Sequence, residues 1–312
     1  MFAGEPAELG HTNPDASKHL DKLTADRSRN RPILLYAAPG CGAENLIRGL
    51  SYLKSFTLVC GSHFPISDAA RAASCFGTPP LLPGLHFLAD YRTLLKALRR
   101  MMDSIIDIAP GPTNSARVIY SPDNISNIPI LRQLYPDALH VHLVRDVSWN
   151  PLRIAAEANR PAWSLCKRWR QAERAFLNSP PLPTQVTVRY EELEHAPAET
   201  VDSFIRLAGL SLTAADHQTF SQQFPSANGE AYFNHRSRYP FCDQDPSVRR
   251  ILERMAAHCA AVYCQAELAA LRYKTSIGRP GFLHSFAVVV ALRLISRADI
   301  SCKLSRAGGA SS

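Results

Sequence analysis

Residues 135–146, YPDALHVHLVRD, constrain the fold more than any other part of the chain. They combine the end of a helix, a short turn, a strand at residues 139–144 and, directly after that strand, Arg145 and Asp146. Parallel sheets are covered on both faces, so their strands are buried runs of this kind. In α/β proteins, ligands bind outside the carboxyl ends of such strands. Arg145 therefore predicts a phosphate or sulfate site, because its guanidinium group is permanently charged and suited to these anions.

Other apolar runs alternate with segments of helical spacing along the chain. We expect strands at residues 32–37, 56–60, 117–120 and 185–188, and helices at residues 45–54, 91–108, 128–135, 151–158, 162–177, 198–207 and 246–273. Strands that alternate with helices form parallel βαβ units. The sequence therefore predicts an α/β fold, a single domain in which helices flank a parallel β-sheet.

The chain of 312 residues is long enough for one large α/β domain. We expect a flexible N-terminal segment at residues 1–29, the domain at residues 30–273 and a basic extension at residues 274–312. The net charge is +8, and the extension alone holds six Lys or Arg and one Asp. The remaining charge forms no recognisable basic face, so we expect no nucleic-acid partner. Membrane contact through the extension is an alternative to a plain tail.

The eight cysteines show no CxxC pairing and no zinc spacing. This pattern indicates reduced thiols in a reducing compartment, and so a cytoplasmic protein, rather than a disulfide framework. The first twenty residues are polar and lack the apolar core of a signal peptide. We expect no metal site.

Two segments carry a resemblance to a known family. Residues 188–210, VRYEELEHAPAETVDSFIRLAGL, have a strand that ends in Tyr-Glu-Glu-Leu, then Pro, then a helix that ends in Gly-Leu. Residues 120–146 combine Ser-Pro, an Asn, a helix, Tyr-Pro-x-Ala, a strand and Arg-Asp. In both, the chain resembles carbohydrate and bacterial sulfotransferases that use 3′-phosphoadenosine 5′-phosphosulfate (PAPS) as donor. The resemblance covers about residues 32–273 and implies their P-loop-like fold.

The resemblance implies roles for individual residues. Arg145 would bind the 3′-phosphate of the donor, and Tyr190 would lie near the adenine. Family members usually place a Ser eight residues after the Arg, on the same phosphate. Arg153 holds that position here while Ser148 lies nearer, and either could take the role. The alternatives are a surface Arg145 that pairs with Asp146, and a core Tyr190 that anchors the end of a strand.

Residues 32–50, PILLYAAPGCGAENLIRGL, resemble the 5′-phosphosulfate site of the family. A loop of this kind directs backbone N–H groups and the positive end of a helix at a phosphate. The loop residues expected to bind the donor are Pro39, Gly40, Cys41, Gly42 and Ala43.

This loop departs from the family pattern, roughly Gly-x-Pro-Arg/Lys-Ser-Gly-Thr-Thr-x-Leu. Gly40 replaces the basic residue, Cys41 replaces the Ser, and Ala43 and Glu44 replace the two Thr. In the segment at residues 120–146, Tyr120 replaces the Lys that the family commonly has there. A hydrogen bond to a charged group contributes roughly 1.5–3 kcal/mol. The losses predict weakened donor binding, and restoring Arg at position 40 and Thr at positions 43 and 44 would test this.

Sulfonyl transfer needs a base for the acceptor proton and positive charge near the bridging oxygen. Glu44 and His63 are the two candidates for the base, since related enzymes carry Glu and His in similar places. The alternative for His63 is a loop histidine without a role in proton transfer. His140 and His142 alternate along one strand, so we interpret both as packing residues.

The resemblance therefore predicts a sulfotransferase that moves a sulfonyl group from PAPS to a hydroxyl or amine of a small-molecule, carbohydrate or protein acceptor. The alternative is an inactive protein of the same fold that serves as a binding or scaffold module. A P-loop kinase or NTPase is disfavoured, because GxxxxGK[ST] and a Mg²⁺-binding pattern are both absent from the sequence.

Overall fold

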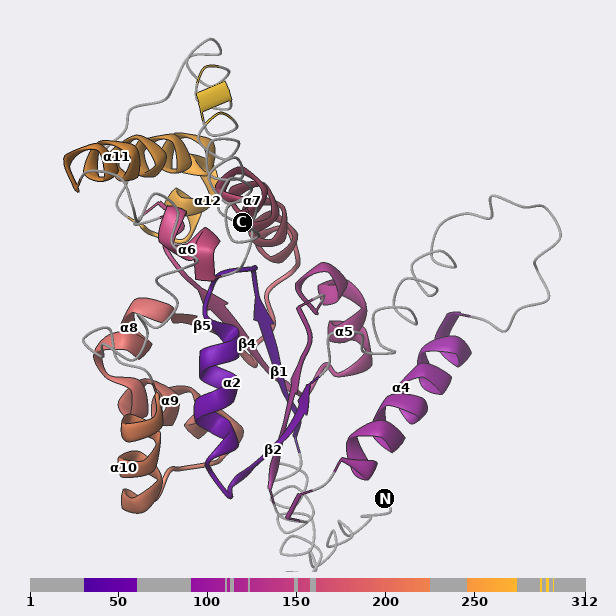
Figure 1. The fold of residues 1–312 in the computed structure, drawn as a ribbon. Coiled ribbons are helices and arrows are strands. Elements are labelled where there is room, and N and C mark those ends of the chain that lie inside the picture. The colour runs from indigo at the N-terminus through magenta and orange to yellow at the C-terminus, as the bar shows by residue number, and fades with distance from the viewer. Residues whose placement is uncertain are drawn as a thin grey trace, which may run out of the picture.

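The structure is a computed structural model that describes residues 31–60, 91–109, 111–112, 115–122, 124–148, 151–157, 161–224, 246–273 and a few positions between 287 and 294. Five strands form one sheet in the order β2-β3-β1-β4-β5, and all neighbouring pairs are parallel (Figure 1). The strands are β1 (Ile33–Ala37), β2 (Phe56–Cys60), β3 (Ala116–Tyr120), β4 (Leu139–Val144) and β5 (Gln185–Arg189). This sheet confirms the predicted α/β fold.

Helices lie on both sides of the sheet (Figure 1). One side carries α2 (Ala43–Ser51), α8 (Tyr190–His195), α9 (Pro197–Ile205), the short η2 (Arg206–Ala208) and α10 (Ala214–Gln223). The other side carries α4 (Tyr91–Ile108), η1 (Asn124–Asn127), α5 (Ile128–Leu134) and α7 (Ala162–Leu177). Beyond the carboxyl ends of the strands lie α6 (Pro151–Glu157), α11 (Pro246–Tyr263) and α12 (Gln265–Ala270). None of the helices in the described part of the chain is long and apolar enough to cross a membrane.

The two histidines of β4 lie in the core, as the sequence predicted. His140 and His142 are both fully buried. The carbonyl oxygen of Tyr135, which only accepts, lies 2.9 Å from His140 Nε2, so Nε2 carries the proton and Nδ1 accepts from the Tyr36 hydroxyl, also at 2.9 Å. Burial lowers the pKa of His140 to about 4, so the ring is neutral near pH 7. His142 stacks on Phe176 of α7 with 3.5 Å between ring centroids.

The C-terminal helix differs from the prediction. One helix was expected over residues 246–273, but the structure has α11 and α12 with a break at Cys264. The Cys264 thiol is buried and donates to the carbonyl oxygen of Cys166 at 3.8 Å. After the break, the buried carboxylate of Glu267 pairs with Arg170 and Arg174 of α7. The chain turns at Cys264 because these contacts stabilise α12 against α7.

The sequence analysis missed the helices α8 and α10. The start of α10 has a recognisable signal, because the Thr213 hydroxyl accepts from the Asp216 N–H while the Asp216 carboxylate accepts from the Thr213 N–H. Such a capping box satisfies two backbone donors that a helix end would otherwise leave unpaired. The TAAD spacing in the sequence could have revealed it.

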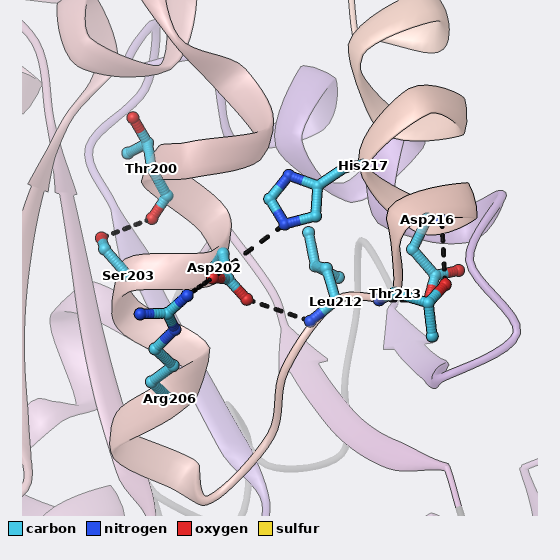
Figure 2. A network of polar contacts seen from close by, with 8 residues as sticks. All are labelled: Thr200, Asp202, Ser203, Arg206, Leu212, Thr213, Asp216 and His217. Carbon is cyan, nitrogen blue, oxygen red and sulfur yellow. Dashed lines mark hydrogen bonds and ion pairs between the residues drawn. The ribbon is translucent and has the colours of Figure 1, made fainter.

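Asp202 joins α9 to the start of α10, as Figure 2 shows. Its carboxylate accepts from the backbone N–H of Leu212 at 3.0 Å and pairs with Arg206, and His217 Nε2 lies 4.0 Å away. The side chain is buried. The Leu212 N–H, followed by Arg206, lowers the pKa of Asp202 below its usual value. Its charged form therefore stabilises the turn between the two helices.

We expect Asp202→Ala to destabilise the protein by about 1–3 kcal/mol, because it leaves the buried Leu212 N–H without its acceptor. The pKa is lower in the folded than in the unfolded state, so this stabilisation is present above about pH 3.9 and is lost as the pH falls through the folded-state pKa. Urea unfolding of both proteins at pH 7 and at pH 3 measures it. A stability difference that widens in acid would contradict the role of the charged carboxylate.

Candidate functional site

The register of three neighbouring strands brings the expected site residues together. Ala37 of β1 lies opposite Leu143 of β4, and Val144 of β4 lies opposite Arg189 of β5. Parallel strands end at the same edge of a sheet, so the glycine turn after β1, Arg145 after β4 and Tyr190 after β5 meet there. This agrees with the prediction that Arg145 and the glycine turn share one site.

The glycine turn comprises residues 38–42 and ends where α2 begins at Ala43, two residues earlier than predicted. Gly40 and Gly42 have φ values of +85° and +84°, in the left-handed region that favours glycine. Gly42 is the N-cap of α2 and supplies no side-chain cap. The first N–H groups of a helix have no partner within the helix. The turn therefore offers backbone donors to an anion, as a phosphate-binding loop would.

Arg145 points at the glycine turn and is buried. Its Nη1 donates to the carbonyl oxygen of Gly40 at 3.4 Å, and its guanidinium carbon lies 4.3 Å from the ring centroid of Tyr190. Its Nη2 lies 3.5 Å from Oε1 of Glu194, and the side chain is only 3% exposed. The alternative interpretation, a surface arginine, is wrong, because Tyr190 and the turn cover this side chain. Sequence reasoning did not identify Glu194 as its partner.

Tyr190 contacts both Arg145 and the glycine turn. The residue starts α8 and is 1% exposed. Its hydroxyl accepts from Nδ2 of Asn45 in α2 at 2.9 Å, and its ring lies against Gly42. The side chain thus anchors α8 to α2. The expected proximity of Tyr190 to an adenine stays a prediction.

The residues that follow Arg145 are tied to α8. The Asp146 N–H donates to Oε1 of Glu191 at 2.8 Å, and Glu191 Oε2 accepts from the Tyr273 hydroxyl at 3.1 Å. The Ser148 hydroxyl donates to the Asp146 carboxylate at 2.6 Å. Arg153 lies in the first turn of α6, and its side chain lies outside the described part of the structure. The choice between Ser148 and Arg153 as a phosphate ligand therefore stays open.

Four further predicted site residues are Pro39, Cys41, Ala43 and His63, of which the structure describes the first three. Cys41 is 1% exposed, and burial raises the pKa of its thiol well above the usual value. It therefore remains a neutral thiol, and its backbone N–H donates to the carbonyl oxygen of Ala38 at 3.1 Å. Ala43 is also buried, whereas Pro39 is half-buried. His63 lies outside the described residues.

Among the described residues, no group of three or more His, Cys, Asp or Glu side chains is arranged to hold a metal ion. The five cysteines in these ranges, Cys41, Cys60, Cys166, Cys259 and Cys264, all have free thiols.

Residues 84–214 match the model of a family described as the sulfotransferase family. Over these residues the chain is similar to members of that family. The matched part contains Tyr120, Arg145, Tyr190 and Glu194, whereas the glycine turn precedes it. No curated protein sequence matches the chain.

Several solved structures of bacterial sulfotransferases are similar to this chain. The sulfotransferase domain of an olefin synthase from Synechococcus PCC 7002 is 14% identical, with 85% of this chain and 96% of that chain covered and a TM-score of 0.44. A sulfotransferase from Alicyclobacillus acidocaldarius is 17% identical, with coverages of 79% and 98% and a TM-score of 0.43. A sulfotransferase from Mycobacterium tuberculosis H37Rv is 15% identical, with coverages of 72% and 80% and a TM-score of 0.40.

The structure explains one departure from the sulfotransferase pattern, the glycine at position 40. A Cβ atom there would lie 2.5 Å from Cγ2 of Ile154 and 2.9 Å from Cδ1 of Leu165, and the φ value of +85° disfavours any side chain. The basic residue of the pattern therefore does not fit this backbone. The idea that Arg can simply be restored at position 40 is wrong, because Ile154 and Leu165 fill the space that it would need.

Two further departures from the pattern contact each other. The Tyr120 hydroxyl, at the end of β3, donates to Oε1 of Glu44 in the first turn of α2 at 3.2 Å. Burial and, after it, the Glu44 carboxylate raise the pKa of Tyr120, so the phenol keeps its proton and acts as the donor. Glu44 is exposed. The pair places an oriented, solvent-accessible carboxylate beside the glycine turn.

Proposed function

We propose that the protein is a sulfotransferase that uses PAPS as donor and sulfonates a hydroxyl or amine of a small molecule, a carbohydrate or a protein. The observation that carries this proposal is the position of Arg145 beside the glycine turn, where two neighbouring parallel strands end. The family match of residues 84–214 supports the sulfotransferase role.

The residues at the strand ends fit the two anionic ends of such a donor. Arg145 would bind the 3′-phosphate, since a guanidinium group forms strong charge-assisted hydrogen bonds to phosphate oxygens. The glycine turn and the first N–H groups of α2 would bind the 5′-phosphosulfate through backbone donors. Because Gly40 brings no cation to this end, the backbone carries more of the binding than in the family pattern.

The reaction needs a base that removes the proton of the acceptor hydroxyl or amine. Of the two candidates, Glu44 is the one that the structure describes, as an exposed carboxylate beside the glycine turn. In the transfer, the acceptor oxygen or nitrogen forms a bond to sulfur as the bond from sulfur to the 5′-phosphate oxygen breaks. The acceptor proton passes to the carboxylate, and adenosine 3′,5′-bisphosphate leaves. The hydrogen bond from Tyr120 orients this carboxylate. His63 is the second candidate for the same task.

Binding of adenosine 3′,5′-bisphosphate, measured by titration calorimetry on the full chain, tests the donor site without knowledge of the acceptor. We expect saturable binding, and weaker binding of adenosine 5′-phosphate, which lacks the group that Arg145 would hold. Transfer of labelled sulfonate from PAPS to a panel of hydroxyl and amine acceptors then tests the reaction. Equal affinity for the two nucleotides, or no binding of either, would overturn the assignment of Arg145.

An inactive binding protein of the same fold is the second candidate, and the altered loop favours it. Glu44 adds negative charge where the family pattern has a hydroxyl, and position 40 holds no cation. This candidate predicts that adenosine 3′,5′-bisphosphate binds weakly or not at all while the fold is intact, and that no labelled sulfonate is transferred to any acceptor. The two assays together therefore separate the candidates.

A further inference from the structure

The arginine that the proposed function assigns to a phosphate already contacts an anion within the protein. Glu194 Oε1 lies 3.5 Å from Arg145 Nη2, one of the donor groups that the proposed function assigns to the phosphate. Arg145 is 3% exposed and Glu194 is 17% exposed. The carboxylate is therefore the more exposed member of the pair.

Helix α8 explains why two of its side chains contact the same guanidinium group. Tyr190 and Glu194 are four residues apart, so they lie one turn apart on one face of the helix. The Tyr190 ring stacks on the guanidinium group while Glu194 approaches its Nη2 atom. Helix α8 thus places an aromatic ring and a carboxylate against Arg145.

Several contacts hold the backbone of α8 in place, whereas the Glu194 side chain is partly exposed. The helix follows β5 directly and is tied to α2 through Tyr190 and Asn45. Glu191 ties it to the Asp146 N–H and to the Tyr273 hydroxyl. A rotation of the Glu194 side chain toward solvent would expose Arg145 without disturbing these contacts.

We propose that Glu194 competes with the 3′-phosphate of the nucleotide for Arg145, and this proposal rests on the proposed function. A phosphate monoester carries about −1.5 to −2 charges at neutral pH and displaces a carboxylate of charge −1. The apparent affinity is then the intrinsic affinity multiplied by the fraction of molecules in which Glu194 has moved away. A nucleotide without the 3′-phosphate has no group to place on Arg145, so Glu194 does not affect its binding. Glu194 is therefore a residue that determines nucleotide affinity and specificity.

Glu194→Gln, which removes the charge and keeps the shape, tests the competition. We expect its affinity for adenosine 3′,5′-bisphosphate to rise about tenfold over the natural chain, if Glu194 leaves Arg145 in about one molecule in ten. Its affinity for adenosine 5′-phosphate is expected to stay unchanged. Glu192→Gln is the matched control, because it removes the same charge from an exposed position of the same helix. It is expected to bind both nucleotides as the natural chain does.

The outcomes separate this proposal from the proposed function. If the natural chain and Glu194→Gln bind the bisphosphate with equal affinity, or if both nucleotides gain equally, the competition is refuted while the donor site stands. If no variant binds the bisphosphate, the donor site itself is refuted, and the competition falls with it. Thermal unfolding of each variant verifies that it folds. Glu194→Asp provides a second test, since its shorter side chain retracts from Arg145 and should raise the affinity by a smaller factor.

Discussion

Replacing Arg145 with alanine is expected to weaken the binding of adenosine 3′,5′-bisphosphate between about tenfold and a hundredfold, which corresponds to one lost charge-assisted contact. The affinity for adenosine 5′-phosphate should change little, because this nucleotide lacks the 3′-phosphate. The variant should therefore bind the two nucleotides alike. Titration calorimetry with both nucleotides measures the effect.

The alanine variant also removes the ion pair between Arg145 and Glu194, so the folding of this variant must be measured separately. Arg145→Lys keeps the positive charge but loses the planar fork, and we expect it to recover only part of the affinity. Arg168→Ala removes the same charge from an exposed position of α7 and should leave binding unchanged. A folded Arg145→Ala protein that still prefers the bisphosphate would show that another group binds the 3′-phosphate.

Replacing Gly42 with alanine is expected to destabilise the protein by roughly 2–5 kcal/mol, the combined cost of a left-handed residue and of an overpacked core. The φ value at Gly42 is +84°, and a Cβ atom there would overlap the buried ring of Tyr190. Either the glycine turn or α8 must therefore move. Unfolding in urea measures the change in stability.

Gly209→Ala is the matched control for Gly42→Ala. Gly209 also has a positive φ value, 73°, but it is exposed, so alanine there adds the backbone strain without the contact with Tyr190. We expect it to cost about 1–2 kcal/mol. Equal losses from the two substitutions would mean that the Tyr190 ring does not pack against Gly42 as described.

Elements with strong local signals were predictable from the sequence. The bounds of β2, β4, α4 and α7 agree with the predicted ranges, because each is an apolar run or an amphipathic repeat with clear ends. The meeting of Gly40 and Arg145 was also predictable. It requires only that β1 and β4 are parallel and adjacent, and then the turn after one strand lies beside the residue after the other.

The contacts between distant side chains were not predictable in the same way. Glu194 and Arg145 are 49 positions apart in the chain, and Glu44 and Tyr120 are 76 apart. No local pattern encodes such pairs, since they depend on the strand order and on where α8 places each side chain. The break at Cys264 was missed for a similar reason. The helical repeat continues through it, and only the contacts with α7 favour the turn.

The hydrogen bond between Tyr273 and Glu191 shows that residues beyond the family match, which ends at residue 214, contact the helix that carries the site. Arg189 stacks on the same tyrosine ring and donates to the carbonyl oxygen of Leu271. Leu271 and Tyr273, which follow α12, thereby stabilise the end of β5 and the start of α8, the helix that carries Tyr190 and Glu194. A fragment that ends at residue 214 would keep the glycine turn, Arg145, Tyr190 and Glu194 but lose the contacts of Leu271 and Tyr273 that support them.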